Sequence, residues 1–461
     1  MTIFKALSLG VGDADKHRLI ADHLAGQIAS GVLAQGDRLP PVRQAAWSVG
    51  VHPGTMARAY KALEARGLVH GEVGRGTFVG GASRARSLHL DPPPQGHVDL
   101  SINSFSIATP RAALADAFEY AAAGLRAGDL ATGYVSETGR LEDRAAILPW
   151  LSRRLGDIAP DQVLLTAGGQ SGVHAALSSF VSTGAAAACD AVTYPGVITA
   201  AVQLGIPLVG IAIDDAGMVP EALEDACRRR RIALLVISPS VQNPTGIAMP
   251  AVRRAAIAEI AARHGLIILE DEVYGFLGDE TLPSFFSMLP QQAVHLTSLS
   301  KQVAPALRIG YLAGPPALLR RAALAQKNCQ MMVSPILASA ASHIAASGLL
   351  ERRRDLLLGE VARRYHAAAR LLGMVNQVLK PSGLVWLHVP DAWRLGEFCR
   401  EAERQNVLLA PADLFAVDAG NVPHAVRLSL TAEADFDRLM EAVATISRLL
   451  QLSNPVPGAI A

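Results

Sequence analysis

Three short segments between residues 242 and 308 constrain this chain more than any other feature. They are a Gln-Asn-Pro-Thr-Gly turn at 242–246, an Asp-Glu-Val-Tyr segment at 271–274 and a Ser-Leu-Ser-Lys segment at 298–301. The first two directly follow apolar runs that read as buried strands. In α/β proteins ligands bind at the carboxyl ends of the strands, so the segments are predicted to line one site.

The residue types in these segments fit pyridoxal phosphate (PLP). That cofactor needs a lysine for the Schiff base, an acid beside the pyridine nitrogen and hydrogen-bond donors for the ring oxygen. Lys301, Asp271 and the pair Asn243 and Tyr274 would fill these roles. Each segment alone is commonly a turn or a surface lysine, but their ordered combination with Arg308 favours a cofactor site.

The phosphate of such a cofactor is expected at a helix start. An apolar run at 163–166 ends in Ala-Gly-Gly-Gln-Ser at 167–171, and a helical pattern follows. The free N–H groups there, from Gly169 and Gln170, would bind the phosphate. Hydroxyl and guanidinium partners would come from Ser298, Ser300 and Arg308.

The order of elements indicates an α/β fold. Apolar runs at 232–238 and 266–270 alternate with helical stretches such as 250–263, a pattern typical of a mostly parallel sheet covered by helices. From about residue 348 long helices dominate, with one strand-like segment at 384–389. These residues are predicted to form a smaller C-terminal α+β subdomain.

The first 80 residues have a different pattern. Three helices are predicted, over 17–30, from about 41 to 49 and over 53–66, ending at Gly31, Gly50 and Gly67. Two strand segments, 68–70 and 77–79, flank a glycine-rich turn and predict a hairpin. Residues 1–90 hold eleven Lys and Arg against six acids, a formal charge of +5 in a chain of net +1. This is a winged helix-turn-helix pattern with the charge that suits DNA.

The predicted boundaries give a winged helix-turn-helix domain over 1–80, a proline-containing linker over 81–97 and a PLP-binding domain over 98–461. No apolar window approaches the roughly 20 residues of a membrane span, and the start lacks a secretory signal pattern. We therefore expect a cytoplasmic protein without a membrane partner. The four cysteines are far apart in the sequence, so neither a metal site nor a disulfide framework is expected.

Two known families resemble these two parts. Residues 97–450 resemble fold-type I PLP enzymes of the aspartate aminotransferase family, including the Lys-Gln-Val-Ala-Pro-Ala-Leu-Arg run at 301–308. Residues 13–80 resemble the winged helix of GntR regulators through Gly-Asp-Arg-Leu-Pro-Pro-Val-Arg at 36–43 and Gly-Arg-Gly-Thr-Phe-Val at 74–79. The fusion resembles the MocR subfamily, whose members are expected to be homodimers that bind repeated half-sites of double-stranded DNA.

The resemblance implies further site residues. Tyr194 would stack on the cofactor ring, Arg427 would bind the carboxylate of an effector, and Tyr134 would reach the phosphate in the partner subunit. For DNA we expect contacts from residues of the second and third helices and the wing: Arg43, His52, Thr55, Arg58 and Arg75. The chain departs from the family where His52 stands in place of a common arginine and where Gly169 replaces a common serine.

The sequence thus predicts a PLP-dependent transcriptional regulator that senses an amino acid or amine when the effector displaces Lys301 and forms an external aldimine. Two alternatives remain open. One is a working aminotransferase with an accessory winged helix, because every residue for transamination is present. The other is a DNA-binding protein whose PLP-like domain only dimerises, which intact Lys301, Asp271 and Asn243 disfavour. The sequence does not identify the effector or the operator. It also does not show whether the protein activates or represses transcription, or whether any transaminase turnover remains.

Overall fold

The protein divides into two compact units, residues 1–86 and 87–461. In this computed structural model the described residues are 16–29, 32–33, 37–65, 68–72, 76–79, 93–107, 109–130, 132–374, 381–418 and 420–452. The predicted linker over 81–97 lies mostly outside these ranges, so its boundaries stay a prediction. No helix in the described ranges has both the length and the apolar character needed to cross a bilayer.

The first unit is a winged helix-turn-helix. It contains α1 (Lys16–Ala29), α2 (Val42–Val49), α3 (Pro53–Ala65) and an antiparallel hairpin of β1 (Val69–Glu72) and β2 (Gly76–Val79). Apolar residues of all three helices, such as Ile20, Ala46 and Met56, form its core. Gly50 has a φ of 72° and ends α2 with a left-handed cap, as predicted. The predicted ends at Gly31 and Gly67 lie outside the described residues.

The second unit is built on a seven-stranded sheet with strand order β4-β12-β11-β10-β9-β5-β6. All neighbouring strands are parallel except that β12 runs antiparallel to both β11 and β4. The sheet is therefore mixed, which agrees with a mostly parallel prediction. Its strands are β4 (Val163–Thr166), β5 (Ala186–Asp190), β6 (Leu208–Ile211), β9 (Ile232–Ile237), β10 (Ile267–Asp271), β11 (Ala293–Ser298) and β12 (Gly310–Ala313).

Both faces of this sheet are buried. Along β4, Val163 and Leu165 enter one apolar core and Leu164 enters the other. One face is covered by α7 (Gly169–Phe180), α8 (Pro195–Gln203) and α13 (Pro316–Gln330), and the other by α4 (Arg111–Ala127), α10 (Ala251–His264) and α14 (Pro335–Ala346). Such double burial explains why the strands read as continuous apolar runs in the sequence. Smaller elements complete the unit: α5 (Leu141–Ala146), α6 (Leu148–Leu155), β7 (Ile213–Asp214), β8 (Gly217–Met218), α9 (Pro220–Arg229), α11 (Phe285–Met288) and α12 (Leu299–Gln302).

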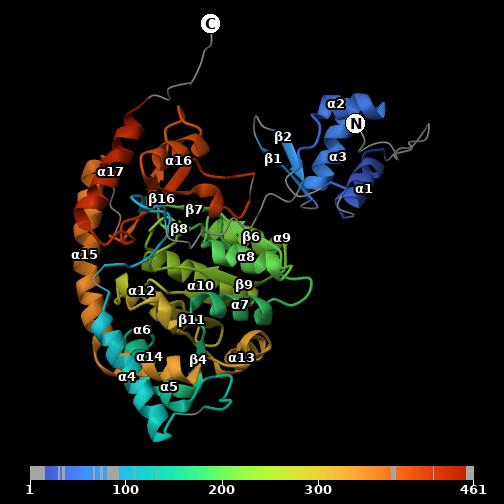
Figure 1. The fold of residues 1–461 in the computed structure, drawn as a ribbon. Helices are drawn as coiled ribbons and strands as arrows, with labels where there is room; N and C mark the ends of the chain where they lie inside the picture. Colours follow the sequence, from blue (N-terminus) through green and yellow to red (C-terminus); the bar gives the residue numbers. More distant parts are fainter. Residues whose placement is uncertain are drawn as a thin grey trace. The chain divides into compact units, whose positions relative to one another are not determined.

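The C-terminal subdomain surrounds a small sheet of order β13-β16-β15. Its elements are α15 (Leu349–Leu371), β13 (Leu384–His388), α16 (Leu395–Arg404), β14 (Val407–Leu408), β15 (Ala410–Pro411), β16 (Ala425–Ser429) and α17 (Phe436–Gln451). Helices α15 and α17 lie side by side (Figure 1). The segment β3 (Val98–Asp99), more than 300 positions earlier in the chain, pairs in parallel with β14. The start of the second unit is thus part of its C-terminal subdomain.

Candidate functional site

One cavity of about 760 Å³ lies in the second unit, at the ends of β9, β10 and β11 and the start of α7. Its wall includes every predicted cofactor and effector residue except Tyr134: Gly169, Gln170, Tyr194, Asn243, Asp271, Tyr274, Ser298, Ser300, Lys301, Arg308 and Arg427. These residues come from segments up to 258 positions apart, and the fold brings them to one place. Pro305 and Ala306 of the loop before β12 complete one side.

Lys301 lies on α12, the single turn of helix that follows β11. The Ser298 side chain caps this turn by accepting a hydrogen bond from the Ser300 amide at 3.2 Å. The Lys301 ammonium donates to the carbonyl of Asn103. Burial and, to a smaller extent, the nearby Arg427 and Arg308 guanidinium groups together lower the pKa of Lys301 to about 8, although Asp271 opposes this fall. Near neutral pH the amine therefore has an appreciable neutral fraction, the form that acts as a nucleophile.

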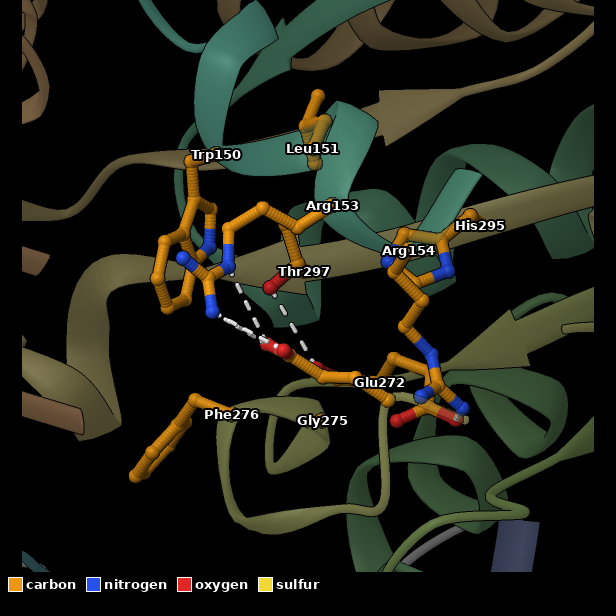
Figure 2. Close-up of a pocket in the computed structure, with 10 residues that line it drawn as sticks. Trp150, Leu151, Arg153, Arg154, Glu272, Gly275, Phe276, His295 and Thr297 are labelled. Carbon is orange, nitrogen blue, oxygen red and sulfur yellow. Dashed lines mark hydrogen bonds and ion pairs between the residues drawn. The ribbon is translucent and has the colours of Figure 1, made fainter. Parts of the chain in front are cut away.

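Asp271 is the only one of three consecutive acids at the end of β10 that lines the cavity. Glu272, the residue after β10, lines a different pocket, where the hydroxyl of Ser240 and the guanidinium of Arg154 donate to it at 2.7 and 3.0 Å. Figure 2 shows Glu272 and Arg154 in this separate, small pocket. Glu270 accepts from the backbone amide of Phe285 at 2.9 Å and lies 3.3 Å from a His295 ring nitrogen.

The carboxyl of Asp271 has few partners. Burial raises its pKa to about 6, while a 3.3 Å hydrogen bond from the Val273 amide opposes this rise. Glu270 and Glu272 are bound by other groups outside the cavity, whereas the Asp271 carboxylate faces the cavity. Asp271 can therefore pair with a cation there. A protonated pyridine nitrogen is such a cation.

The residues beside α7 form a group of hydrogen-bond donors. Arg308 has left-handed backbone dihedrals, with φ of 48°, and its guanidinium donates to the Ala167 carbonyl at 3.1 Å. Gly168 has a φ of 82°, and a Cβ atom there would overlap the Arg308 guanidinium. Glycine at 168 thus lets the guanidinium pack against the backbone at the start of α7. Helix N–H groups, an arginine and the hydroxyls of Ser298 and Ser300 make a set that suits a phosphate.

Arg427 lies on β16 and is fully buried. Its Nη1 donates to Asn243 Oδ1 at 2.9 Å and its Nη2 donates to the Ser101 carbonyl. Its Nε has no hydrogen-bond partner among the described residues. The guanidinium lies 4.8 Å from the centre of the Phe415 ring, and burial lowers its pKa to about 10. A buried guanidinium with an unused N–H at a cavity wall is suited to a carboxylate.

The comparisons with known proteins agree with this geometry. Residues 95–446 match the model of the family described as aminotransferase class I and II. The chain belongs to this family. Residues 16–79 match the family of bacterial regulatory proteins of the gntR type. The chain is therefore a GntR-family transcriptional regulator with an aminotransferase-like domain, and the predicted MocR-type fusion is confirmed.

The chain is similar both to transcriptional regulators and to aminotransferases. An uncharacterized HTH-type transcriptional regulator of Bacillus subtilis, YdeF, is 29% identical over 94% of each chain. The pyridoxine biosynthesis regulator PdxR of Corynebacterium glutamicum is 27% identical over 78% of this chain and 80% of its own. The structure of LysN, an α-aminoadipate aminotransferase of Thermus thermophilus, has a TM-score of 0.69 and 25% identity and covers 77% of this chain and 92% of its own.

The regulator also has site residues that the sequence did not reveal. Ile102, Asn103 and Ser104 line the cavity. They lie outside any helix or strand, shortly after β3 and the predicted linker over 81–97, and no periodic pattern marks them. Tyr134, in contrast, is 84% exposed and does not belong to the cavity wall of its own chain. Its predicted role in the partner subunit stays a prediction.

The predicted DNA contacts lie in the first unit. The side chains of Arg43 on α2, His52 before α3 and Arg58 on α3 are exposed, and Thr55 is half-buried. His52 Nδ1 accepts from the Gly54 amide at 3.1 Å, which fixes the ring at the start of α3. The predicted contact Arg75 lies outside the described residues. Residues 38–63 contain four Lys and Arg and no acid, so this segment suits a polyanion.

Proposed function

We propose that this regulator binds PLP at Lys301 and senses an amino acid or amine effector, and that effector binding changes its affinity for operator DNA. The observation that supports this most is the meeting of Lys301, Asp271 and Arg427 in one cavity of a chain that also has a GntR domain. The first two groups suit the cofactor and the third suits an effector carboxylate. Because the same chain has a DNA-binding domain, ligand binding in this cavity could change the affinity for operator DNA.

The residues present fit PLP, which supplies an electron-withdrawing ring when it is bound. Asp271 would pair with the ring nitrogen, and Asn243 and Tyr274 would donate to the ring oxygen. Tyr194, which is largely buried at the cavity wall, would cover a face of the ring. The phosphate would meet Gly169, Gln170, Ser298, Ser300 and Arg308. The printed title of the related LysN structure describes a complex with a phosphopyridoxyl-leucine, which supports a cofactor of this type here.

Arg427 would hold the effector. Its free Nε and its Nη2 can both point at one carboxylate, and a bidentate pair of this kind is among the stronger hydrogen-bonded contacts in proteins. The ligand would compete with the Ser101 carbonyl for Nη2. The cavity of about 760 Å³ exceeds what the cofactor alone fills, which leaves room for a small amino acid.

A homodimer would place Tyr134 in a neighbouring site. This tyrosine is 84% exposed on a loop, and the same unit exposes Phe118 and Tyr120 on α4 and Ile336 on α14, two helices that are in contact. Exposed apolar residues that gather on neighbouring helices favour an interface between subunits. Two chains would also present two DNA-binding units to repeated half-sites, with Arg43, His52, Thr55, Arg58 and Arg75 near the DNA.

Reduction with borohydride tests the cofactor assignment. The purified full-length protein should absorb in the visible range, and reduction should add the cofactor mass to Lys301 alone. Lys327, which is 47% exposed on its side chain, is the internal control that should stay unmodified. A colourless protein that gains no adduct after incubation with PLP would refute the proposal.

The sensor assignment is tested separately with the twenty protein amino acids, each added singly to the PLP-loaded protein. At least one should change both the cofactor spectrum and the affinity for operator DNA. Arg427→Ala should lose both responses to a carboxylate ligand and keep the cofactor, whereas Arg438→Ala, at a half-exposed arginine of α17, should respond as the wild type does. If Arg427→Ala responds fully, the effector role of Arg427 is wrong.

A working aminotransferase is the second candidate. The specific observation in its favour is Lys301 itself, whose pKa of about 8 suits a group that moves protons near neutral pH. A 2-aminoadipate transaminase of Thermus thermophilus is also 27% identical over 73% of this chain. Rapid, multiple-turnover formation of a keto acid without any effect on DNA binding would establish this candidate in place of the sensor.

A further inference from the structure

A segment near the start of the described part of the second unit contributes Ile102, Asn103 and Ser104 to the cavity wall. We call residues 98–107 the strap. Its Leu100 carbonyl accepts from the Ser429 amide at 2.9 Å, and its Ser104 carbonyl accepts from the Thr431 hydroxyl at 2.6 Å. Its Ser101 carbonyl accepts from Arg427. The strap is therefore fastened to β16 and the residues that follow it.

Asn103 connects the strap to two other residues of the cavity wall, Lys301 and Tyr274. It is 5% exposed and lines the cavity beside Lys301. Its Nδ2 donates to the Tyr274 hydroxyl at 2.7 Å, its Oδ1 accepts from the Ser429 hydroxyl at 3.4 Å, and its carbonyl accepts from Lys301. One residue of the strap thus touches two of the predicted cofactor residues.

The bond from Asn103 determines what Tyr274 can do. A phenol has one hydrogen to donate and accepts at its oxygen. Because the Asn103 amide can only donate through Nδ2, the phenol hydrogen stays available for an acceptor in the cavity. Burial raises the pKa of Tyr274 well above its usual value, so the hydroxyl keeps this hydrogen at physiological pH. The ring oxygen of the cofactor is an acceptor of the required kind.

We propose that Asn103 is a positioning residue that aims the Tyr274 hydroxyl at the cofactor and links the state of the site to the strap. This inference rests on the proposed function. The strap continues in sequence toward the DNA-binding unit, and a ligand carboxylate on Arg427 would compete with its Ser101 carbonyl two residues earlier. An effector on Arg427 would change the hydrogen bond of Ser101, and the cofactor would change the bonds that Tyr274 and Lys301 make to Asn103. Both ligands would therefore alter the bonds of the strap.

The decisive variant is Asn103→Asp, which keeps the size of the side chain and replaces the donor with an acceptor. Tyr274 would then donate to the introduced carboxylate and not to the cofactor. The visible absorbance of the PLP-loaded, full-length protein is titrated with pH. The midpoint of this titration should rise by about one pH unit, because the deprotonated form of the bound cofactor loses one ordinary hydrogen bond from Tyr274. Asn421→Asp makes the same chemical change at an exposed position and should leave the midpoint unchanged.

A double-mutant cycle separates positioning from general damage. Tyr274→Phe should shift this midpoint in the same direction, and adding the uncharged change Asn103→Ser to it should shift the midpoint little further, because both changes act on the one hydrogen bond from the Tyr274 hydroxyl. If Asn103→Asp does not fold, Asn103→Ser takes its place, since its hydroxyl is too short to reach Tyr274. Additive shifts in the double variant would overturn the positioning role.

The link to the strap has its own measurement. For an amino acid that alters DNA affinity in the wild type, the ratio of Kd values with and without it should fall by about threefold or more in Asn103→Asp. A wild-type midpoint together with a wild-type ratio would overturn the inference and leave the proposed function intact. A wild-type protein that shows no cofactor absorbance would overturn both.

Discussion

Replacement of Lys301 by methionine should stabilise the cofactor-free protein at neutral pH. The pKa of this amine is about 8 in the folded protein against an ordinary value of 10.5, so keeping it charged inside the cavity costs about 3 kcal/mol. Methionine removes this cost and preserves the volume of the side chain. It also removes the hydrogen bond to the Asn103 carbonyl, which is worth about 1 kcal/mol. The net gain expected at pH 7 is therefore about 2 kcal/mol.

The pH dependence gives the sharper test. Between about pH 8 and pH 10.5 the unfolded wild type binds more protons at this lysine than the folded wild type, so wild-type stability rises with pH in that window. The advantage of Lys301→Met should consequently shrink from pH 8 upward and disappear by about pH 10.5. Urea unfolding of both proteins, freed of cofactor and followed by circular dichroism, measures the difference in the transition of the second unit.

Lys327→Met serves as the matched control, because the Lys327 side chain is 47% exposed. It should change stability little and with no dependence on pH in this range. The reasoning would be refuted if Lys301→Met were less stable than the wild type at pH 7, or if its advantage persisted unchanged to about pH 10.5. Either result would show that burial does not penalise the charged amine.

Three further outcomes are expected. The affinity for PLP should fall as the pH drops below about 6, because Asp271 becomes protonated there. Asp271→Asn should bind PLP roughly tenfold to a hundredfold more weakly at pH 7 and should lose this pH dependence. Equilibrium dialysis at several pH values measures both affinities. Gly168→Ala should weaken PLP binding without unfolding the first unit, because the added methyl group displaces Arg308. Gly184→Ala is the control for backbone strain, because Gly184 also has a positive φ but a methyl group there meets no neighbouring atom. Equal losses of PLP affinity in both variants would contradict this explanation. Arg43→Ala should weaken specific DNA binding by roughly 1–3 kcal/mol if Arg43 makes a bidentate contact to a base. The fluorescence of Trp47, which is the one tryptophan in residues 1–86 and is 86% exposed, follows this binding. An unchanged affinity for DNA would exclude the contact.

The sequence was sufficient to predict the part of the cavity that follows strand ends. Asn243 and Asp271 each follow a buried apolar run and Lys301 follows the end of β11, and parallel strands bring such ends together. Arg427 could be placed only through the resemblance to aminotransferases, because nothing in its local pattern on β16 distinguishes a cavity arginine from a surface one. The structure shows that it is fully buried, which no periodicity predicted.

Asn103 and Ser101 could not be predicted for a different reason. Their contacts depend on the pairing of β3 with β14 and on bonds to β16, all with partners more than 300 positions away. Pairing over such separations depends on the packing of the whole subdomain and leaves no mark in the nearby sequence. The antiparallel orientation of β12 could not be predicted for another reason, because a four-residue apolar run is compatible with either strand direction.

Assembly of the cavity from distant segments has a consequence during protein synthesis. Arg427 follows Val79, the last residue of β2, by 348 positions. At roughly 5–20 residues per second a ribosome needs roughly 20–70 s to cover that distance. Throughout this interval a nascent chain would carry the whole sequence of the DNA-binding unit before Arg427 can join the cavity. Weak DNA binding by an isolated first unit would keep such unfinished chains from occupying operators, so a dependence on the paired, full-length protein would also act as a check that synthesis is complete.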